Sequence, residues 1–347
     1  MKSLMKSLKE YISEGLLDRV KSKEVNHKIF IEEFLEANYD INGSYTIKET
    51  KTGFVVDVKG EAEVKNRNIT SLTNEFFKFG NVSRTFNCSY CNSLKTLEGA
   101  PEKVRSNFYC YGCGLTTLEG APEKVGGTFD CNWCNSLKNL EGAPEKVGKN
   151  FNCIGCESLK TLKGSPKEVG KYFLCKSCKS LEILEDAPEK VGDHFDCSYC
   201  KSLKSLKGSP KEVGSFDCSN CESLRTLEGA PKETLGYFSC DHCDSLTTLE
   251  GAPEKVGRDF DCNNCDSLKT LEGAPKECND FKCSWCKSLT SLKGAPQKVE
   301  RGFNCSNCKS LRTLEGAPKE VGWRFDCDGC GVQFTEEDVK KYTTVLL

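Results

Sequence analysis

The sequence is poor in the residues and motifs on which most catalytic sites depend. It has three histidines, His27, His194 and His242, and each lies in a different local pattern without a recurring partner residue. No phosphate-binding loop, nucleophile elbow or paired-carboxylate motif stands apart from the rest of the chain. The sequence therefore predicts a protein that is not an enzyme, and neither a cofactor nor a small-molecule substrate is expected.

Long apolar runs and an excess of one charge are also missing. No stretch approaches the roughly 18 apolar residues that a membrane span needs. Lysine and arginine number 49 against 51 acidic residues, for a net charge of −2, so the clustered basic excess of a nucleic-acid-binding protein is absent. Residues 1–6 contain no apolar run that resembles a signal peptide. We therefore expect no membrane or nucleic-acid partner, and a cytoplasmic location.

Cysteine is abundant, and its spacing reveals an internal repeat. The chain has 25 cysteines and eleven prolines, and all the prolines share one phase of the repeat. A near-constant period of 21 or 22 residues predicts one coil of chain per repeat, stacked into a solenoid. Twelve Cys-x-x-Cys pairs begin at Cys88, Cys110, Cys131, Cys153, Cys175, Cys197, Cys218, Cys240, Cys262, Cys283, Cys305 and Cys327.

Each coil can be divided by its apolar pattern. Phe195 and Cys197 alternate with a polar residue, which predicts a short strand with both side chains on one face. Leu203 and Leu206 then turn the chain while filling the interior, and a Gly-Ser-Pro or Gly-Ala-Pro segment breaks regular structure. Val213 returns to the core. No segment of the repeat is long enough to predict a full helix.

This pattern resembles the leucine-rich repeat, Leu-x-x-Leu-x-Leu-x-x-Asn/Cys-x-Leu, over about residues 60–334. Phe195 and Cys197 match the Leu-x-Leu strand, Cys200 matches the Asn/Cys position, and Leu203 and Leu206 follow. Phe and Cys replace the usual strand leucines, and most coils carry one extra residue before the next Leu. More narrowly, the chain resembles leucine-rich-repeat-like proteins with Phe-x-Cys and Leu-x-Gly-x-Pro motifs from Bacteroidetes and crAss-like phages. That resemblance implies a bacterial or phage-infected bacterial cell, and says little about function.

The expected fold is a repeat solenoid of short parallel strands and turns, with a helical N-terminal segment and a short C-terminal capping helix. Residues 1–39 form the helical segment, with apolar residues at helical spacing over 1–24 and again over 27–38. Residues 40–85 form an N-terminal cap with the first coils, in which Ala62-Glu63-Val64 takes the place of Phe-x-Cys. Residues 86–330 form twelve Cys-rich coils, and residues 331–347 form the C-terminal cap.

Two interpretations of the cysteines remain open, and disulfides between coils are disfavoured by the geometry that a disulfide demands. Cys88, Cys91, Cys110 and Cys113, like every equivalent set of two pairs, have a spacing that fits a zinc site. The alternative is a structural role, with the first Cys in the core and the second donating or accepting toward turn backbone groups. Val64 occupies the first position in the coil without cysteines, and Cys278 stands where other coils place Val. We therefore favour buried thiols without metal, and keep a zinc-binding thiol stack as the alternative.

The residues between the core positions are the candidates for binding a partner. Strands line the concave face of leucine-rich repeats, so the resemblance implies that these residues point outward there. Exposed aromatic side chains on a mildly acidic face are typical of a recognition surface. The candidates are Tyr90, Tyr109, Tyr111, Trp133, Tyr199, His242, Trp285, Asp130, Asp196, Asp217 and Asp261.

Three functions are compatible with this reading. The first is a non-catalytic protein–protein interaction module that binds an unknown protein through its strand face. The second is the zinc-binding thiol stack, for structural or stored metal. The third is a structural spacer that docks through its N-terminal helix.

Overall fold

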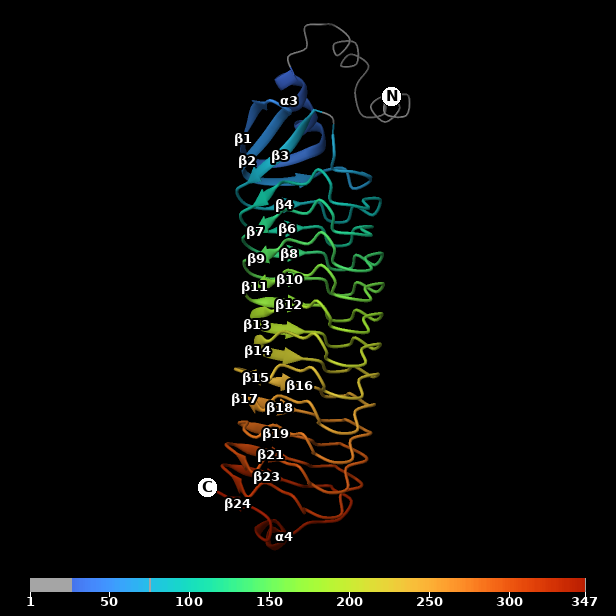
Figure 1. Ribbon diagram of the computed structural model, residues 1–347, viewed down its shortest axis with the longest axis vertical. Helices are drawn as coiled ribbons and strands as arrows, with labels where there is room; N and C mark the ends of the chain where they lie inside the picture. Colours follow the sequence, from blue (N-terminus) through green and yellow to red (C-terminus); the bar gives the residue numbers. More distant parts are fainter. Residues whose placement is uncertain (1–26, 75, 347) are drawn as a thin grey trace.

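The computed structural model describes residues 27–74 and 76–346, which form one elongated, curved array of stacked coils (Figure 1). Helix α3 (His27–Asn38) coincides with the second predicted helix. The first predicted helix, over residues 1–24, lies outside the described residues. Within the described ranges, no helix has the length and apolar character needed to cross a bilayer.

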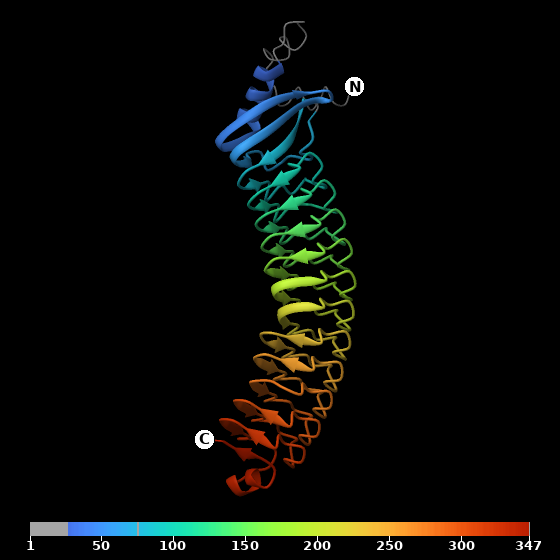
Figure 2. The same ribbon diagram turned by 60° about the vertical axis from the view of Figure 1, so that its left-hand side comes forward.

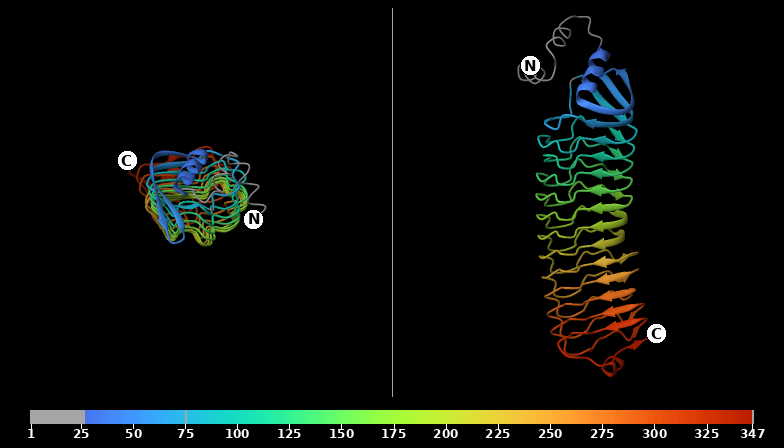
Figure 3. Two further views of the ribbon diagram at one scale, coloured as in Figure 1. Left: turned by 90° about the horizontal axis from the view of Figure 1, so that it is seen from above. Right: turned by 180° about the vertical axis from the view of Figure 1, so that it is seen from behind.

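An antiparallel hairpin closes the N-terminal end of the array. Strand β1 (Tyr39–Thr50) pairs with β2 (Gly53–Val64) over their full length. The second half of β2 then serves as a coil without cysteines, because Ala62 pairs in register with Phe86 of the first Cys-rich coil. Tyr39 is buried, and its ring lies 5.0 Å from that of Phe79 and 6.4 Å from that of Phe86. The end-on view in Figure 3 shows α3 and the hairpin lying across the end of the coils.

Each coil contributes a strand at the predicted Phe-x-Cys position, and these strands pair in parallel along the array. Their register is Phe on Phe, as in Phe151 with Phe129 on one side and Phe173 on the other. The strands are β4 (Phe86–Asn87), β6 (Phe108–Tyr109), β8 (Phe129–Asp130), β10 (Phe151–Asn152), β12 (Tyr172–Leu174), β13 (Lys190–Asp196), β14 (Glu212–Asp217), β16 (Phe238–Ser239), β18 (Asp259–Asp261), β19 (Asp280–Lys282), β21 (Gly302–Asn304) and β23 (Arg324–Asp326).

A second column of strands was not predicted. The Val that returns to the core lies in a two-residue Lys/Glu-Val strand, which pairs with its equivalent in the next coil. Long strands β13 and β14 run through both columns. The remaining members are β3 (Phe77–Val82), β5 (Lys103–Val104), β7 (Lys124–Val125), β9 (Lys146–Val147), β11 (Glu168–Val169), β15 (Glu233–Thr234), β17 (Lys255–Val256), β20 (Lys298–Val299), β22 (Glu320–Val321) and β24 (Thr344–Val345).

The core is one continuous column of stacked side chains. Twelve phenylalanine rings from Phe86 to Phe325 lie one above the other, with centroids 5.1–5.5 Å apart and planes within 14° of parallel. The spacing is close to that of hydrogen-bonded strands, because in-register pairing places identical residues directly above one another. The cysteines and leucines of each coil fill most of the rest of the interior, together with a Val in most coils. A single coil could not bury these faces alone.

The C-terminal end is closed as the sequence predicted. Helix α4 (Glu336–Lys340) begins after Thr335, whose side chain accepts a hydrogen bond from the backbone N–H of Asp338, and the Asp338 carboxylate bonds back to Thr335. This capping box satisfies backbone donors that the first turn leaves open. Strand β24 then returns to pair with β22.

The array bends, and its strands lie on the concave side, while the loops that carry the leucines and Gly-Ala-Pro segments lie on the convex side (Figure 2). Charged side chains pair between neighbouring coils, as in Lys190 with Glu212 at 2.7 Å and Lys276 with Glu254 at 2.8 Å. Both of these pairs are exposed, so each contributes about 0–1 kcal/mol to stability. Their effect is to favour the correct register of one coil on the next.

Candidate binding surface

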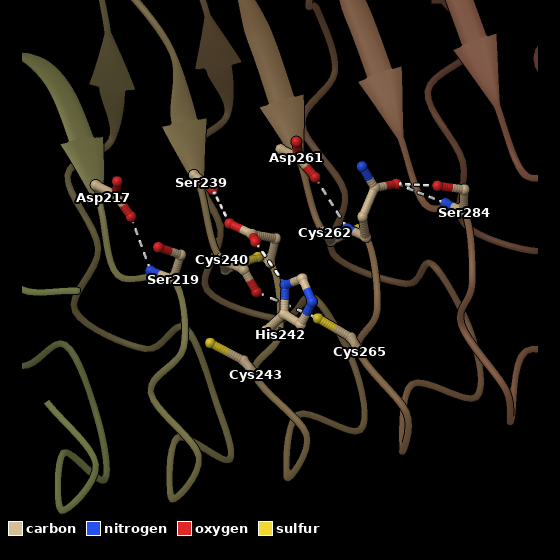
Figure 4. A network of polar contacts seen from close by, with 12 residues as sticks. Asp217, Ser219, Ser239, Cys240, His242, Cys243, Asp261, Cys262, Cys265 and Ser284 are labelled. Carbon is tan, nitrogen blue, oxygen red and sulfur yellow. Dashed lines mark hydrogen bonds and ion pairs between the residues drawn. The ribbon is translucent and has the colours of Figure 1, made fainter. Parts of the chain in front are cut away.

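The four candidate aspartates have a structural role that the sequence did not reveal. Each lies after the buried Phe, and its carboxylate accepts a hydrogen bond of 2.8–3.0 Å from the backbone N–H two residues on. This local bond starts the turn that follows the strand, and Figure 4 shows it for Asp217 and Asp261. Asn87 and Asn304 do the same in other coils. The turn therefore accepts Asn as readily as Asp, and Tyr109, Leu174 and Lys282 hold the same position in other coils, so it does not require a negative charge. The four carboxylates belong to Asp130, Asp196, Asp217 and Asp261.

Burial shifts the protonation of three of these carboxylates. It raises the pKa of Asp130, Asp217 and Asp261, against the lowering effect of their hydrogen bonds. Asp217 also feels the negative charge of Asp196 in the neighbouring coil. The strand face therefore holds acidic groups that are partly removed from water.

Five other candidates stand at one position of the coil, the residue before the second Cys. We call Tyr90, Trp133, Tyr199, His242 and Trp285 the ring-bearing ridge. All five have a left-handed backbone, with φ between 55° and 62°. The other coils place Gly, Asn or, at Ser177, serine in the same conformation. Gly and Asn adopt φ > 0 readily, whereas a bulky residue in this conformation lowers the stability of the fold by about 1–3 kcal/mol.

The ridge side chains remain exposed despite that cost. Trp133 is 55% exposed and Trp285 is 49% exposed. The ring of Trp133 lies over Gly155 of the next coil, where a Cβ atom would come within 2.6 Å of it. Packing of a ring over the glycine of the next coil does not explain the whole ridge. The coils that follow Tyr199 and Trp285 have Asn220 and Asn307, not glycine, at the ridge position.

The structure brings together few of the remaining candidates. Tyr90, Tyr109 and Tyr111 form a cluster at the N-terminal end, with ring centroids 4.9 Å (Tyr90–Tyr111) and 6.3 Å (Tyr109–Tyr111) apart. Further along, the ammonium group of Lys176 lies 5.0 Å from the ring centroid of Tyr199. The candidates therefore follow the array as a strip rather than converging on one pocket.

His242 belongs to a polar chain that does not have the order of a catalytic triad. Its Nδ1 lies 2.7 Å from Asp241, and the other oxygen of that carboxylate accepts a hydrogen bond from the Ser239 hydroxyl (Figure 4). A general base must contact the hydroxyl that it deprotonates. Here the carboxylate stands between the serine and the imidazole, so His242 is not placed to activate Ser239.

Sequence reasoning missed the outward column just before the buried Phe. Tyr172 and His194 occupy it on neighbouring coils of the concave face and Tyr237 lies two coils beyond His194, with the rings of Tyr172 and Tyr237 at 6.4 Å and 5.5 Å from that of His194. Burial, with the charges of Asp217 and Asp196, raises the pKa of Tyr237 to about 12. Residues two apart on a strand point to the same face, so this column lies beside the residues that directly follow the Phe, from Asn87 to Asp326, which we call the Asx column. The same alternation could have been used to predict this column from the sequence.

The second Cys of each pair holds consecutive coils together through its thiol. In eleven consecutive coils its Sγ donates to the backbone carbonyl of the first Cys of the preceding coil, at 3.1–3.3 Å, as Cys200 does to Cys175. The bond from Cys265 to Cys240 is drawn in Figure 4. Among the described residues that carbonyl has no backbone donor except at Cys131, which accepts from the Cys134 N–H at 3.4 Å, and a buried carbonyl without a partner would be costly.

The first Cys of each pair packs in the core beside the stacked rings. All 25 cysteines are free thiols in this structure, and 24 of them are buried. Cys278 is buried in the column that Val256 and Val299 occupy elsewhere, as its position in the sequence predicted. Burial raises the thiol pKa well above its ordinary value at Cys197 and Cys218, for example. A buried thiol with a raised pKa is a poor nucleophile.

We expect at most one or two thiols of the native protein to react quickly with an aromatic disulfide reagent, and 25 to react after unfolding without chelator or reductant. Cys330 is the first expected to react, because it alone among the 25 is only half-buried. Stopped-flow absorbance on the full chain measures both numbers. If fewer than 25 thiols react in the unfolded protein and chelator raises the number to 25, the result would support zinc on the thiols. If only a reductant raises the number to 25, the missing thiols would be in disulfides.

Comparison with solved structures finds leucine-rich repeat proteins. One, from Bacteroides ovatus, is 14% identical, with 82% of this chain and 94% of that one aligned at a TM-score of 0.34. Another, a leucine rich cell surface protein from Faecalibacterium prausnitzii, is 10% identical, with 88% and 97% aligned at a TM-score of 0.28. No family model and no curated protein matches the sequence. The narrower relation to phage proteins stays a prediction.

Proposed function

We propose that the chain is a non-catalytic interaction module that binds a protein partner through the ring-bearing ridge and the adjacent strand face. The observation that supports this most is the backbone of the ridge. Tyr, Trp and His stand exposed where Asn or Gly would relieve strain, and strain retained at exposed positions is characteristic of functional sites. Exposed tryptophans also supply the largest contact area at protein interfaces.

The arrangement favours an extended contact over a pocket. Ridge residues recur from Tyr90 to Trp285 along one edge of the strands, and half-buried acidic groups such as Asp130 and Asp261 line the face beside them. A partner that lies along several coils would contact more than one ring. Buried free thiols would persist in a reducing compartment, which supports a bacterial cytoplasm as the place of action.

Replacing both Trp133 and Trp285 with asparagine tests the proposal without damaging the turn. Asn220, Asn264 and Asn307 already hold this position with φ between 56° and 60°, so thermal stability should be unchanged or higher. After a partner has been identified by affinity capture and mass spectrometry, its Kd for the double variant should rise by about 30-fold or more, the effect of losing a hot-spot residue.

Trp323→Asn is the matched control. Trp323 is also highly exposed, at 66%, but it lies outside the ridge, so its replacement should leave the Kd unchanged. An unchanged Kd in the double variant would contradict the proposal. If deletion of residues 1–24 alone abolished binding, the spacer hypothesis would be favoured instead.

A further inference from the structure

We propose that His194, Asp196 and Asp217 form a binding site for one divalent transition-metal ion on the concave strand face. This inference is independent of the proposed function. One imidazole nitrogen and two carboxylate oxygens lie within 4.8 Å of one another, and they form the only such group of three among the residues that the structure describes. The site is distinct from the cysteines, which lie on the other side of the strands, in the core.

The two carboxylates face each other across neighbouring strands. Asp196 of β13 and Asp217 of β14 are direct partners in the parallel register. The Asx column from Asn87 to Asp326 contains no other pair of acidic neighbours: Asp130 pairs with Asn152 and Asp261 with Lys282. Like charges directly opposite on paired strands are destabilising.

The turn does not explain why both residues are acidic. Asp196 and Asp217 each accept a backbone N–H bond, and Asp217 is also hydrogen-bonded to the Ser219 side chain, so each carboxylate keeps lone pairs for a ligand. Asn87 and Asn304 make the same bond without a charge. Elsewhere on this face Asp259 is paired with Lys282, whereas no ion pair formed by the described residues includes Asp196 or Asp217. A bound cation would neutralise both charges.

His194 has the bonding that a metal-bound histidine shows. Its Nε2 lies 3.4 Å from the hydroxyl of Tyr237, and its Nδ1 is buried with no hydrogen-bond partner. In metal sites one ring nitrogen binds the ion while the other contacts a hydrogen-bonding group that orients the ring. Tyr237 is therefore a positioning residue. It reaches His194 across Ser215, the small residue that pairs with His194 on β14.

The donor set indicates the class of ion. One imidazole with two carboxylates suits Zn²⁺ or Mn²⁺, and three protein ligands leave at least one coordination position open to water. Ligand atoms about 2.1 Å from a tetrahedral ion lie about 3.4 Å apart. Binding therefore requires the ligand atoms, now within 4.8 Å of one another, to close by up to about 1.4 Å, a movement that small rotations of the half-buried Asp and His side chains supply.

The test is a titration of the reduced, chelator-treated full chain with Mn²⁺, followed by electron paramagnetic resonance, and then with Zn²⁺ by calorimetry. Mn²⁺ is the decisive probe, because thiolates bind it poorly and the cysteines cannot imitate the site. We expect one equivalent to bind. Asp217→Asn and His194→Ala should each weaken binding by at least 100-fold, and Tyr237→Phe by about 10–100-fold.

Asp261→Asn is the matched control, because it removes a carboxylate from the same column and keeps the same turn. It should bind metal as the parent does. In chelator, Asp217→Asn should raise the melting temperature by more than the control does, since it removes the repulsion from Asp196 as well as a partly buried charge. Equal metal affinity in Asp217→Asn and the parent, or no binding of either ion at millimolar concentration, would overturn the proposal.

Discussion

Replacement of Phe173 by alanine is expected to lower the free energy of unfolding by about 3–5 kcal/mol. The side chain is fully buried, and its ring lies 5.3 Å from that of Phe151 and 5.2 Å from that of Phe195. Removing it leaves a cavity and breaks two stacked contacts, each of which contributes about 0.5–1.5 kcal/mol beyond the buried area. The column cannot collapse to fill the gap, because the strand ladder fixes the spacing of the coils.

The loss should also divide the array into two parts that unfold separately. In a solenoid each coil contacts only its neighbours, so stability is the sum of coil and interface contributions. A weak coil in the middle reduces the coupling between the two sides. Trp133 lies on the N-terminal side of Phe173, and Trp285 and Trp323 lie on the C-terminal side, so tryptophan fluorescence can report each side in variants that retain only one group.

Chemical denaturation followed by circular dichroism and by these tryptophans is the measurement. Phe325→Ala is the control, because Phe325 is only half-buried and stacks on Phe303 alone. Phe325→Ala should lower the free energy of unfolding clearly less than Phe173→Ala does. The two sides of the array should then still unfold in a single transition. A Phe173 variant that is no less stable than the Phe325 variant would show that the stacked rings are not the main source of coupling.

The sequence correctly predicted structural features that recur in every copy of the repeat. Twelve copies of Phe-x-Cys-x-x-Cys identified the first strand and its buried face, and Ala62 in the coil without cysteines identified the N-terminal cap. The second strand column was missed because a two-residue Lys-Val strand has no alternation to detect. Its pairing comes from stacking, which places Val147 beside Val169 of the next coil.

The local structure of the candidate surface was predicted less well, for a different physical reason. Residue type made Trp133 and Asp196 candidates for contact with a partner, but it did not reveal that one belongs to a left-handed turn and that the other starts such a turn. Asn264 and Gly155 at the phase of Trp133 were a usable signal, since both favour φ > 0. His194 and Asp217 lie 23 residues apart, and only the register of β13 and β14 brings them together.

Replacement of Gly229 by alanine should be almost as damaging as the loss of a core ring. Gly229 has a φ of 93°, and a Cβ atom there would lie 2.4 Å from the backbone N and Cα of Lys207 in the preceding coil. The strain of that backbone and the steric overlap each cost about 1–3 kcal/mol, which together give about 2–6 kcal/mol. Relief requires the coils to separate, which weakens the bond from Leu206 N–H to the Glu228 carbonyl.

The equivalent residue of another coil provides the reciprocal test. Asp186 occupies this position with a φ of 66°, nearer to the left-handed region that Asp tolerates. Asp186→Gly should therefore change stability by less than about 1 kcal/mol, because relief of strain is offset by the greater entropy of glycine in the unfolded chain. The two variants and the parent are compared in the same denaturation experiment. If Gly229→Ala also changed stability by less than 1 kcal/mol, close approach between coils would not be what selects glycine here.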